Sequence, residues 1–200
     1  MGREPARLVT VALTVVRISP SHSAFGTVAV LFDDYRAHYG WPPSPQLTHD
    51  WLHAQVTQQA MMITAALRAG RACGFIAASV MPASLALGTA WSVRDLYVAP
   101  PHRRMGIARV LLRQVIDDAR QAGAHRVSLP TETGNTPALT LYTAAGFSPS
   151  PAWNCSASTS HATAMTRGTR FSACFRASAG PGHLGGTLLG QRRRAVSGVP

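Results

Sequence analysis

Apolar residues recur with two different periods over the first 147 positions of this chain, and each period predicts one kind of element. From Phe25 to Tyr39 they follow one another at spacings of three and four, which is the stripe of an amphipathic helix. Ser23 is the expected N-cap of this helix, and Gly40 with the following prolines is its expected end. Further helices are predicted from Thr48, as N-cap, through Val56, from Gly106 to Gln121, and from Pro137 to Ala145.

Shorter apolar runs, rich in Val, Ile, Thr and Ala, predict strands. They lie at residues 10–18, 62–67, 73–80, 90–98 and 126–129. Gly70 lies between the second and third runs and predicts a hairpin turn there. The order strand, helix, helix, three strands, helix, strand, helix predicts the α/β class, with a mixed central sheet and helices on both of its faces.

The last quarter of the chain has a different composition. Six of the 19 arginines and none of the eight acidic residues lie after Phe147, and Ser, Ala, Gly, Thr and Pro dominate there. Such a segment buries too little apolar surface to offset the entropy lost on ordering. We therefore predict an N-terminal extension at residues 1–12, a folded domain at 13–156 and a basic, disordered tail at 157–200. A frameshift is the alternative origin of the tail, and residues 152–157 are the candidate for a final strand.

The remaining composition is that of a globular protein with 46% hydrophobic residues. No apolar run approaches the roughly 20 residues of a membrane-spanning helix, and the Val- and Thr-rich start favours a strand over a signal peptide. Cys73, Cys155 and Cys174 are odd in number and lack metal-ligand spacing, as is typical of a reduced compartment. His49 and His53 lack a third ligand, which favours a solvated or packed helix face. We expect a cytoplasmic protein with no membrane partner and no metal.

The stretch from Asp95 to Ala108, DLYVAPPHRRMGIA, joins a strand to a helix through a turn that carries two arginines and a glycine. The free N–H groups and the dipole of a helix start attract anions, and a glycine lets the backbone approach phosphate oxygens. Arg103 and Arg104 add positive charge beside Gly106. The stretch therefore predicts a site for an anionic ligand at the start of the helix.

The same residues resemble a family signature. Arg103, Gly106 and Ala108 spell R-x-x-G-x-A, which resembles the acetyl-CoA pyrophosphate signature of the GNAT N-acetyltransferases. A second block, Thr133 to Phe147, is similar to the asparagine, tyrosine and Gly-Phe segment of that family and follows in the same order. The resemblance spans roughly residues 13–147. It implies a mixed, mostly antiparallel sheet with splayed strands near Pro130, where a missing backbone N–H costs little.

Acetyl-CoA is the co-substrate that this resemblance implies. The residues assigned to its binding are Tyr97, Val98, Arg103, Arg104, Met105, Gly106, Ile107, Ala108 and Asn135. For Asn135 an N-cap role is equally open, because Thr136 and Pro137 follow it as in a helix start.

Two residues match catalytic positions of the family. Tyr142 is the expected general acid that protonates the leaving sulfur, with a packed core tyrosine as the alternative. Asp95 is the expected acceptor of the amine proton through water, with a structural carboxylate as the alternative, and Glu132 is a further candidate.

The resemblance implies acetyl transfer to a primary amine. The segment from Phe32 to Tyr39 is similar to that of GNAT relatives that acetylate polyamines or small diamines, so a small or polyamine-like amine is the first expectation. Asp33 and Asp34 are candidates to meet a cationic substrate, with solvent-facing acids as the alternative. An amino-acid-like amine, an antibiotic amine and a protein N-terminus stay open as acceptors, as does a homodimer. Two other functions compete with an enzyme. One is a catalytically degenerate acetyl-CoA-binding domain, and the other is nucleic-acid binding through the arginine-rich tail, although nucleic acid is not the expected partner.

Overall fold

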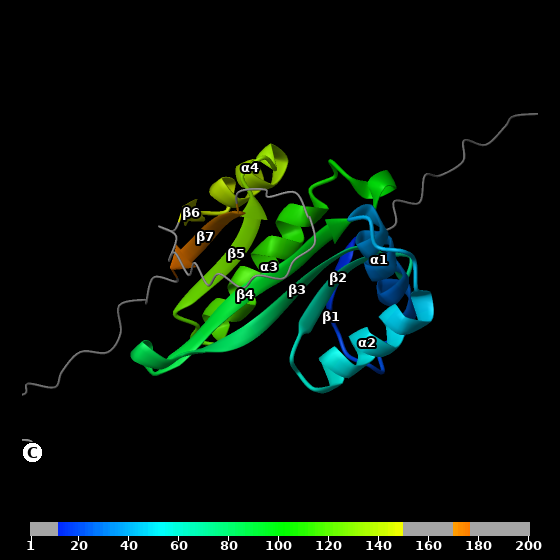
Figure 1. Ribbon diagram of the computed structural model, residues 1–200, viewed down its shortest axis with the longest axis horizontal. Helices are drawn as coiled ribbons and strands as arrows, with labels where there is room; N and C mark the ends of the chain where they lie inside the picture. The colour runs from blue at the N-terminus through cyan, green and yellow to red at the C-terminus, as the bar shows by residue number, and fades with distance from the viewer. Residues whose placement is uncertain (1–11, 150–169, 177–200) are drawn as a thin grey trace, which may run out of the picture.

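The computed structural model describes residues 12–149 and 170–176, and Figure 1 shows their arrangement. The helices are α1 (Phe25–His38), α2 (Pro45–Thr57), α3 (Ile107–Gln121) and α4 (Thr136–Ala144), with short 3-10 turns η1 (Ser84–Ala86) and η2 (Pro100–His102). The strands are β1 (Thr14–Ile18), β2 (Met62–Arg68), β3 (Arg71–Ala83), β4 (Gly88–Val98), β5 (Arg126–Glu132), β6 (Ser148–Pro149) and β7 (Arg170–Arg176). Every helix and strand predicted between residues 10 and 145 is present.

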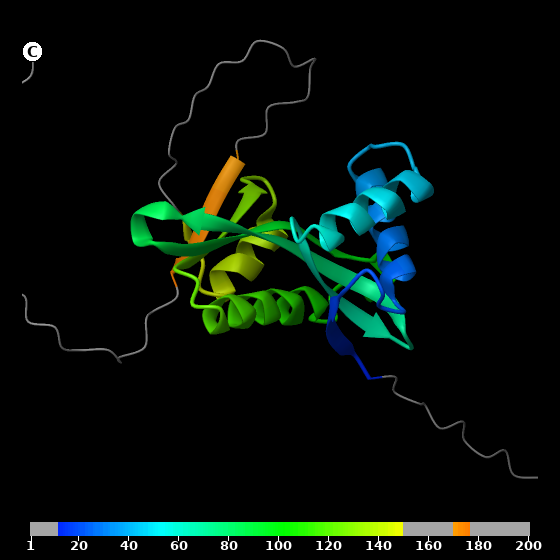
Figure 2. The same cartoon turned by 90° about the horizontal axis from the view of Figure 1, so that it is seen from below.

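The strands form one seven-stranded sheet in the order β1-β2-β3-β4-β5-β7-β6. All neighbours are antiparallel except β4 and β5, which run parallel. Figure 2 shows α3 on one face of the sheet and α1 with α2 on the other. The prediction of a mixed, mostly antiparallel sheet covered on both faces is confirmed.

The alternation of side chains along β3 supplies both layers of the core. Ile76 and Ala78 pack in the cluster that contains the buried stripe of α3, whereas Phe75 and Ala77 pack in the cluster of α1. Successive side chains of a strand point to opposite faces of the sheet, so the continuous apolar run of β3 means that both faces of this strand are buried. The central strands are therefore buried between helices, and the site lies where this packing opens.

A β-bulge in β4 changes which face its residues point to. Val93 pairs with Ala78 and Asp95 pairs with Ala77, so Arg94 is the extra residue. Before the bulge Val93 packs in the α3 cluster, and after it the odd-numbered Tyr97 packs in the α1 cluster. Without the extra residue the period of two would turn Asp95 toward α3.

Two predicted helix starts are wrong. The position before α1 is Ala24, which makes no side-chain cap, and Ser23 is not the N-cap. Helix α2 begins at Pro45, a favourable first-turn residue, with Ser44 before it. Thr48 therefore lies inside α2, and its buried hydroxyl donates a hydrogen bond of 2.6 Å to Asp33 of α1. This contact between α1 and α2, and not a capping role, explains the polar residue at position 48.

A further correction concerns the predicted disordered tail. Residues 170–176 form β7, which pairs antiparallel with the whole of β5 and carries β6 on its other side. The open edge of β5 offers unpaired backbone donors and acceptors, and β7 satisfies them. The sequence signal was the alternation of Phe171, Ala173 and Phe175 with smaller residues. The extension at 1–11, the candidate strand at 152–157 and the arginines at 192–194 lie outside the described residues.

Candidate active site

The site lies where two parallel strands separate. β4 and β5 pair only from Ala90 to Ser92, opposite Arg126 to Ser128, and then diverge toward their carboxyl ends. The opening is a cleft of about 1110 Å³, lined by β4, the start of α3, β5, α4 and the end of α1. Pro130 lies beyond the part of β5 that pairs with β4, although it pairs with β7, and it lines the cleft, so its missing N–H removes no bond to β4.

The turn before α3 presents backbone donors to the cleft. Among the described residues, none of the N–H groups of residues 104–109 has a protein acceptor. Arg104 and Gly106 have φ values of 63° and 79°, in the left-handed region that a residue other than glycine adopts at a cost of about 1 kcal/mol or more. An anion fits at this turn, because the free N–H groups can donate to it and the positive end of the α3 dipole attracts it. The left-handed backbone of Arg104 and Gly106 shapes the turn.

Arg103 is held over the end of β4. Its Nε donates to the carbonyl oxygen of Val98 at 3.0 Å, and its guanidinium lies 5.5 Å from the centre of the Tyr97 ring. Both Tyr97 and Val98 line the cleft. Arg103 therefore brings a positive charge to the strand end that faces the anion-binding turn.

Tyr142 closes the far wall of the cleft from α4. Its ring packs against Phe147 with centroids 6.2 Å apart, and only 9% of its surface is exposed. Burial, with a smaller contribution from Tyr39, raises the pKa of Tyr142 to about 12, so the phenol is protonated at neutral pH. Tyr142 is thus a packed tyrosine that also presents a proton donor to the cleft.

Asp95 faces α1 across the cleft because of the bulge at Arg94. The hydroxyl of Tyr35 donates to Asp95 Oδ1 at 2.8 Å. Burial raises the pKa of Asp95, while the hydrogen bond from Tyr35 and the charge of Arg94 oppose that rise. A half-buried carboxylate with a raised pKa is suited to accept a proton.

The cleft brings together all of the predicted site residues except one. The exception is Met105, which does not line the cleft and is half exposed. Asn135 lines the cleft and also caps α4, since its Oδ1 accepts from the N–H of Ala138 at 3.2 Å. Glu132 lines the cleft as well.

A family model described as the acetyltransferase (GNAT) family matches residues 28–147. The chain belongs to this family. Each block of residues that forms the cleft, from the end of α1 to Tyr142, lies within the matched range. The enzyme is therefore an acetyltransferase.

Two curated relatives are similar to this acetyltransferase. The streptothricin acetyltransferase of Streptomyces lavendulae is 43% identical over 63 residues, which cover 30% of this chain and only 33% of that protein. The uncharacterized N-acetyltransferase YhfO of Bacillus subtilis (strain 168) is 30% identical over 120 residues, which cover 60% of this chain and 80% of that protein.

Solved structures share the fold of the acetyltransferase. A crystal structure of a probable acetyltransferase superposes with a TM-score of 0.65 at 26% identity, covering 77% of this chain and 99% of that one. The yncA protein of Salmonella typhimurium, solved with acetyl-CoA, has a TM-score of 0.62 at 16% identity and covers 82% of this chain and 94% of that one. Within the described part of the acetyltransferase, no helix is both long and apolar enough to cross a membrane.

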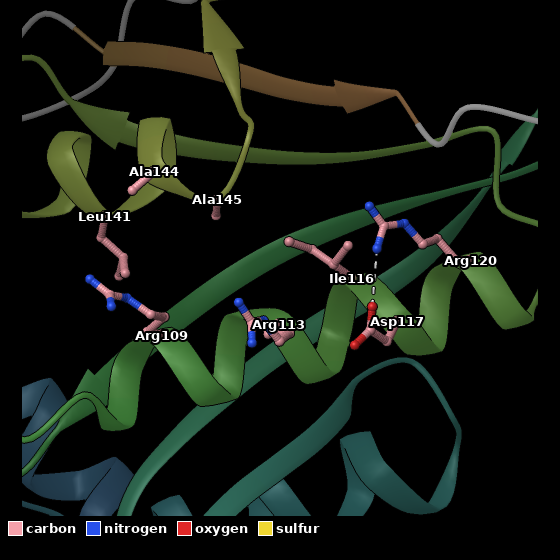
Figure 3. Close-up of a pocket in the computed structure, with 8 residues that line it drawn as sticks. All are labelled: Arg109, Arg113, Ile116, Asp117, Arg120, Leu141, Ala144 and Ala145. Carbon is pink, nitrogen blue, oxygen red and sulfur yellow. Dashed lines mark hydrogen bonds and ion pairs between the residues drawn. The ribbon is translucent and has the colours of Figure 1, made fainter.

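Sequence reasoning assigned no individual role in the site to Tyr35, His38, Tyr39 or Arg109, all of which line the acetyltransferase cleft. Residues 35, 38 and 39 lie in the segment expected to influence the choice of acceptor, but a helical stripe does not say whether it faces a core or an opening. Arg109 lies in the first turn of α3, where it also lines a second cavity of about 240 Å³ against α4. Figure 3 shows Arg109 and Arg113 extending from α3 at this cavity, with Asp117 and Arg120 paired at 3.1 Å.

His49 and His53 lie on a face of α2 that meets Phe25, where His49 is half-buried and His53 is exposed, in agreement with the expected solvated or packed face. Their ring centroids are 6.4 Å apart, and they approach the Phe25 ring at 5.3 and 5.7 Å. No group of three or more potential metal ligands occurs among the residues that the structure describes.

Proposed function

We propose that this acetyltransferase moves the acetyl group of acetyl-CoA to the primary amine of a small, cationic, polyamine-like molecule. The observation that carries the proposal is one cleft that joins an anion-binding turn to a proton acceptor and a proton donor. Arg103, Arg104 and Gly106 supply the turn, Asp95 the acceptor and Tyr142 the donor. The pairing of β7 with β5 completes the sheet beside the cleft, which favours an enzyme over a degenerate binding domain.

The residues of the turn suit the diphosphate of acetyl-CoA. Its oxygens would meet the free N–H groups of residues 104–109, and Arg103 and Arg104 would neutralise its charge. The splayed backbone of Tyr97 and Val98 would hold the pantetheine arm, with Asn135 opposite. When bound, acetyl-CoA supplies an acetyl group activated as a thioester.

The transfer moves one proton off nitrogen and one onto sulfur. Asp95 accepts, through water, the proton that the amine nitrogen loses as it bonds to the acetyl carbon. Tyr142 donates its phenolic proton to the sulfur that leaves that carbon and regains a proton from solvent. Burial raises the pKa of Tyr142 to about 12, so the phenol carries its proton at neutral pH, and the same burial disfavours a free thiolate, which favours the protonated thiol as the product. The products are an acetamide and a thiol.

The amines to be tested as acceptors include an antibiotic because of the similarity to a streptothricin acetyltransferase. The segment shared with the streptothricin acetyltransferase is 43% identical, which favours streptothricin as a second candidate beside small diamines. An amino acid and a peptide with a free N-terminus complete the panel.

Thiol release from acetyl-CoA over this panel tests the proposal. We expect release with at least one cationic amine and a loss of about 10²-fold or more in turnover for Asp95→Asn. Thermal stabilisation by acetyl-CoA without release from any amine would support the degenerate binding domain instead. An absence of stabilisation, together with salt-sensitive DNA binding, would support the nucleic-acid alternative.

A further inference from the structure

Four aromatic rings line the cleft at the end of α1. They are Tyr35, His38, Tyr39 and Tyr97, here named the aromatic wall. Tyr35 lies 5.1 Å from Tyr39 and 5.5 Å from Tyr97, and His38 lies 5.4 Å from Tyr39 and 6.0 Å from Tyr97, measured between ring centroids. Two of these four pairs are close to perpendicular and two are tilted, so ring faces and edges point in several directions.

Core packing does not account for the whole wall. Tyr97 is buried and Tyr35 is half-buried, and both rings contact Phe75 of the core. Tyr39, in contrast, is 55% exposed, although it lies on a cleft wall. A large ring left in solvent at a cleft is typical of a surface that contacts a ligand.

Two carboxylates lie in the cleft beside the wall, and its other charged lining residues are Arg94, Arg103, Arg104 and Arg109. Asp95 lies at the base of the wall, hydrogen-bonded to Tyr35, and Glu132 lines the same cleft. The wall also stands at the C-terminal end of α1, where the helix dipole is negative. Arg94 lines the cleft too, but it is exposed and solvent screens its repulsion.

The chain itself uses this wall to hold a cation. The Arg103 guanidinium lies 5.5 Å from the centre of the Tyr97 ring, within the distance at which a ring face attracts positive charge. The wall and the proton donor Tyr142 line the same cleft.

We propose that the aromatic wall binds a second, protonated nitrogen of the acceptor, so that the substrate carries an ammonium group besides the amine that reacts. The inference rests on the proposed acetyl transfer and adds the part of the site that selects the acceptor. Tyr39 supplies the exposed ring, and Asp95 with the end of α1 supplies the negative potential.

Matched acceptors test the wall. We expect kcat/KM for 1,4-diaminobutane, corrected for its two equivalent amines, to exceed that for 4-aminobutan-1-ol by about tenfold. Tyr39→Leu should bring the two acceptors to within about twofold of each other, whereas Tyr39→Phe, which keeps the ring, should retain the preference. Leu47→Ala is the control for stability, because Leu47 is 67% exposed and does not line the cleft. Equal use of both acceptors by the unchanged enzyme would overturn the inference and leave acetyl transfer standing.

A binding experiment separates the wall from the chemistry. Choline and its uncharged isostere 3,3-dimethylbutan-1-ol are titrated into the full chain and detected by NMR. We expect choline to bind more tightly by about fivefold or more, and Tyr39→Leu to abolish the difference. Tighter choline binding without thiol release from any amine would support the wall and contradict the proposed function. Equal binding of the two compounds would contradict the wall.

Discussion

The buried carboxylate of Asp33 ties α1 to the start of α2, and its removal is the most informative test of the fold around the acceptor end. Asp33 is 6% exposed and accepts from Arg36 Nη1 at 2.7 Å, from the Thr48 hydroxyl at 2.6 Å and from the Ser44 N–H at 3.1 Å. Asp33→Ala removes this shared acceptor, and of the three donors only Arg36 keeps another one, the Thr48 hydroxyl oxygen at 2.9 Å. Helix α1 carries Tyr35 and His38 of the aromatic wall, and Tyr39 follows its end, so these contacts of Asp33, here named the brace, also position one side of the cleft.

The magnitude follows from these contacts. A hydrogen bond to a charged group contributes about 1.5–3 kcal/mol, and breaking a buried ion pair by removing one partner costs about 3–5 kcal/mol. The Arg36 side chain is 24% exposed, so water replaces part of its lost contact. We therefore expect Asp33→Ala to lower the free energy of unfolding by about 3 kcal/mol.

Urea unfolding followed by circular dichroism measures this loss. Asp34→Ala is the matched control, because it removes the same charge from the exposed neighbour and should change stability by less than about 0.5 kcal/mol. Equal losses for the two variants would refute the reasoning, since the effect would then come from net charge or helix propensity.

The pH dependence gives an independent check on the brace. Burial alone would raise the pKa of Asp33, but the hydrogen bonds from Thr48, Ser44 and Arg36 outweigh it and hold the pKa below its ordinary value. The stabilisation is therefore present above the unfolded-state pKa of about 3.9 and is lost as the pH falls through the folded-state value. The stability difference between the unchanged protein and Asp33→Asn should narrow below about pH 4.

The remaining predictions concern the cleft. Tyr35→Phe removes a hydrogen bond that lowers the pKa of Asp95, so the acidic limb of the kcat/KM profile should move to higher pH; an unmoved limb would exclude Asp95 as the base. Gly106→Ala should cost about 1 kcal/mol in stability and weaken CoA binding about tenfold by calorimetry, whereas Gly123→Ala, with a φ of 67° beyond the other end of α3, should cost stability alone. Tyr142→Phe should lower kcat by about 10²-fold with little change in KM, and unchanged turnover would remove it from the mechanism.

Local patterns in the sequence were enough to predict much of the structure of this protein. Leu111, Val115 and Ala119 of α3 are buried, as their spacing predicts. A helix has a fixed period, so a single apolar side is enough to decide which side faces the core. The anion-binding turn from Arg103 to Gly106 could also be predicted from the sequence, because the left-handed conformation of Gly106 and the free N–H groups of a helix start depend only on neighbouring residues.

Contacts between distant residues decided the rest. The bulge at Arg94 depends on pairing with β3, and it alone turns Asp95 toward Tyr35. β7 joins the sheet only because β5 offers an open edge. Whether the aromatic stripe of α1 ends in a core or in a cleft depends on where β4 and β5 separate. A sequence period reports which residues share a face, but the partner of that face is set by chain segments far away in sequence, and these meet only in the folded protein.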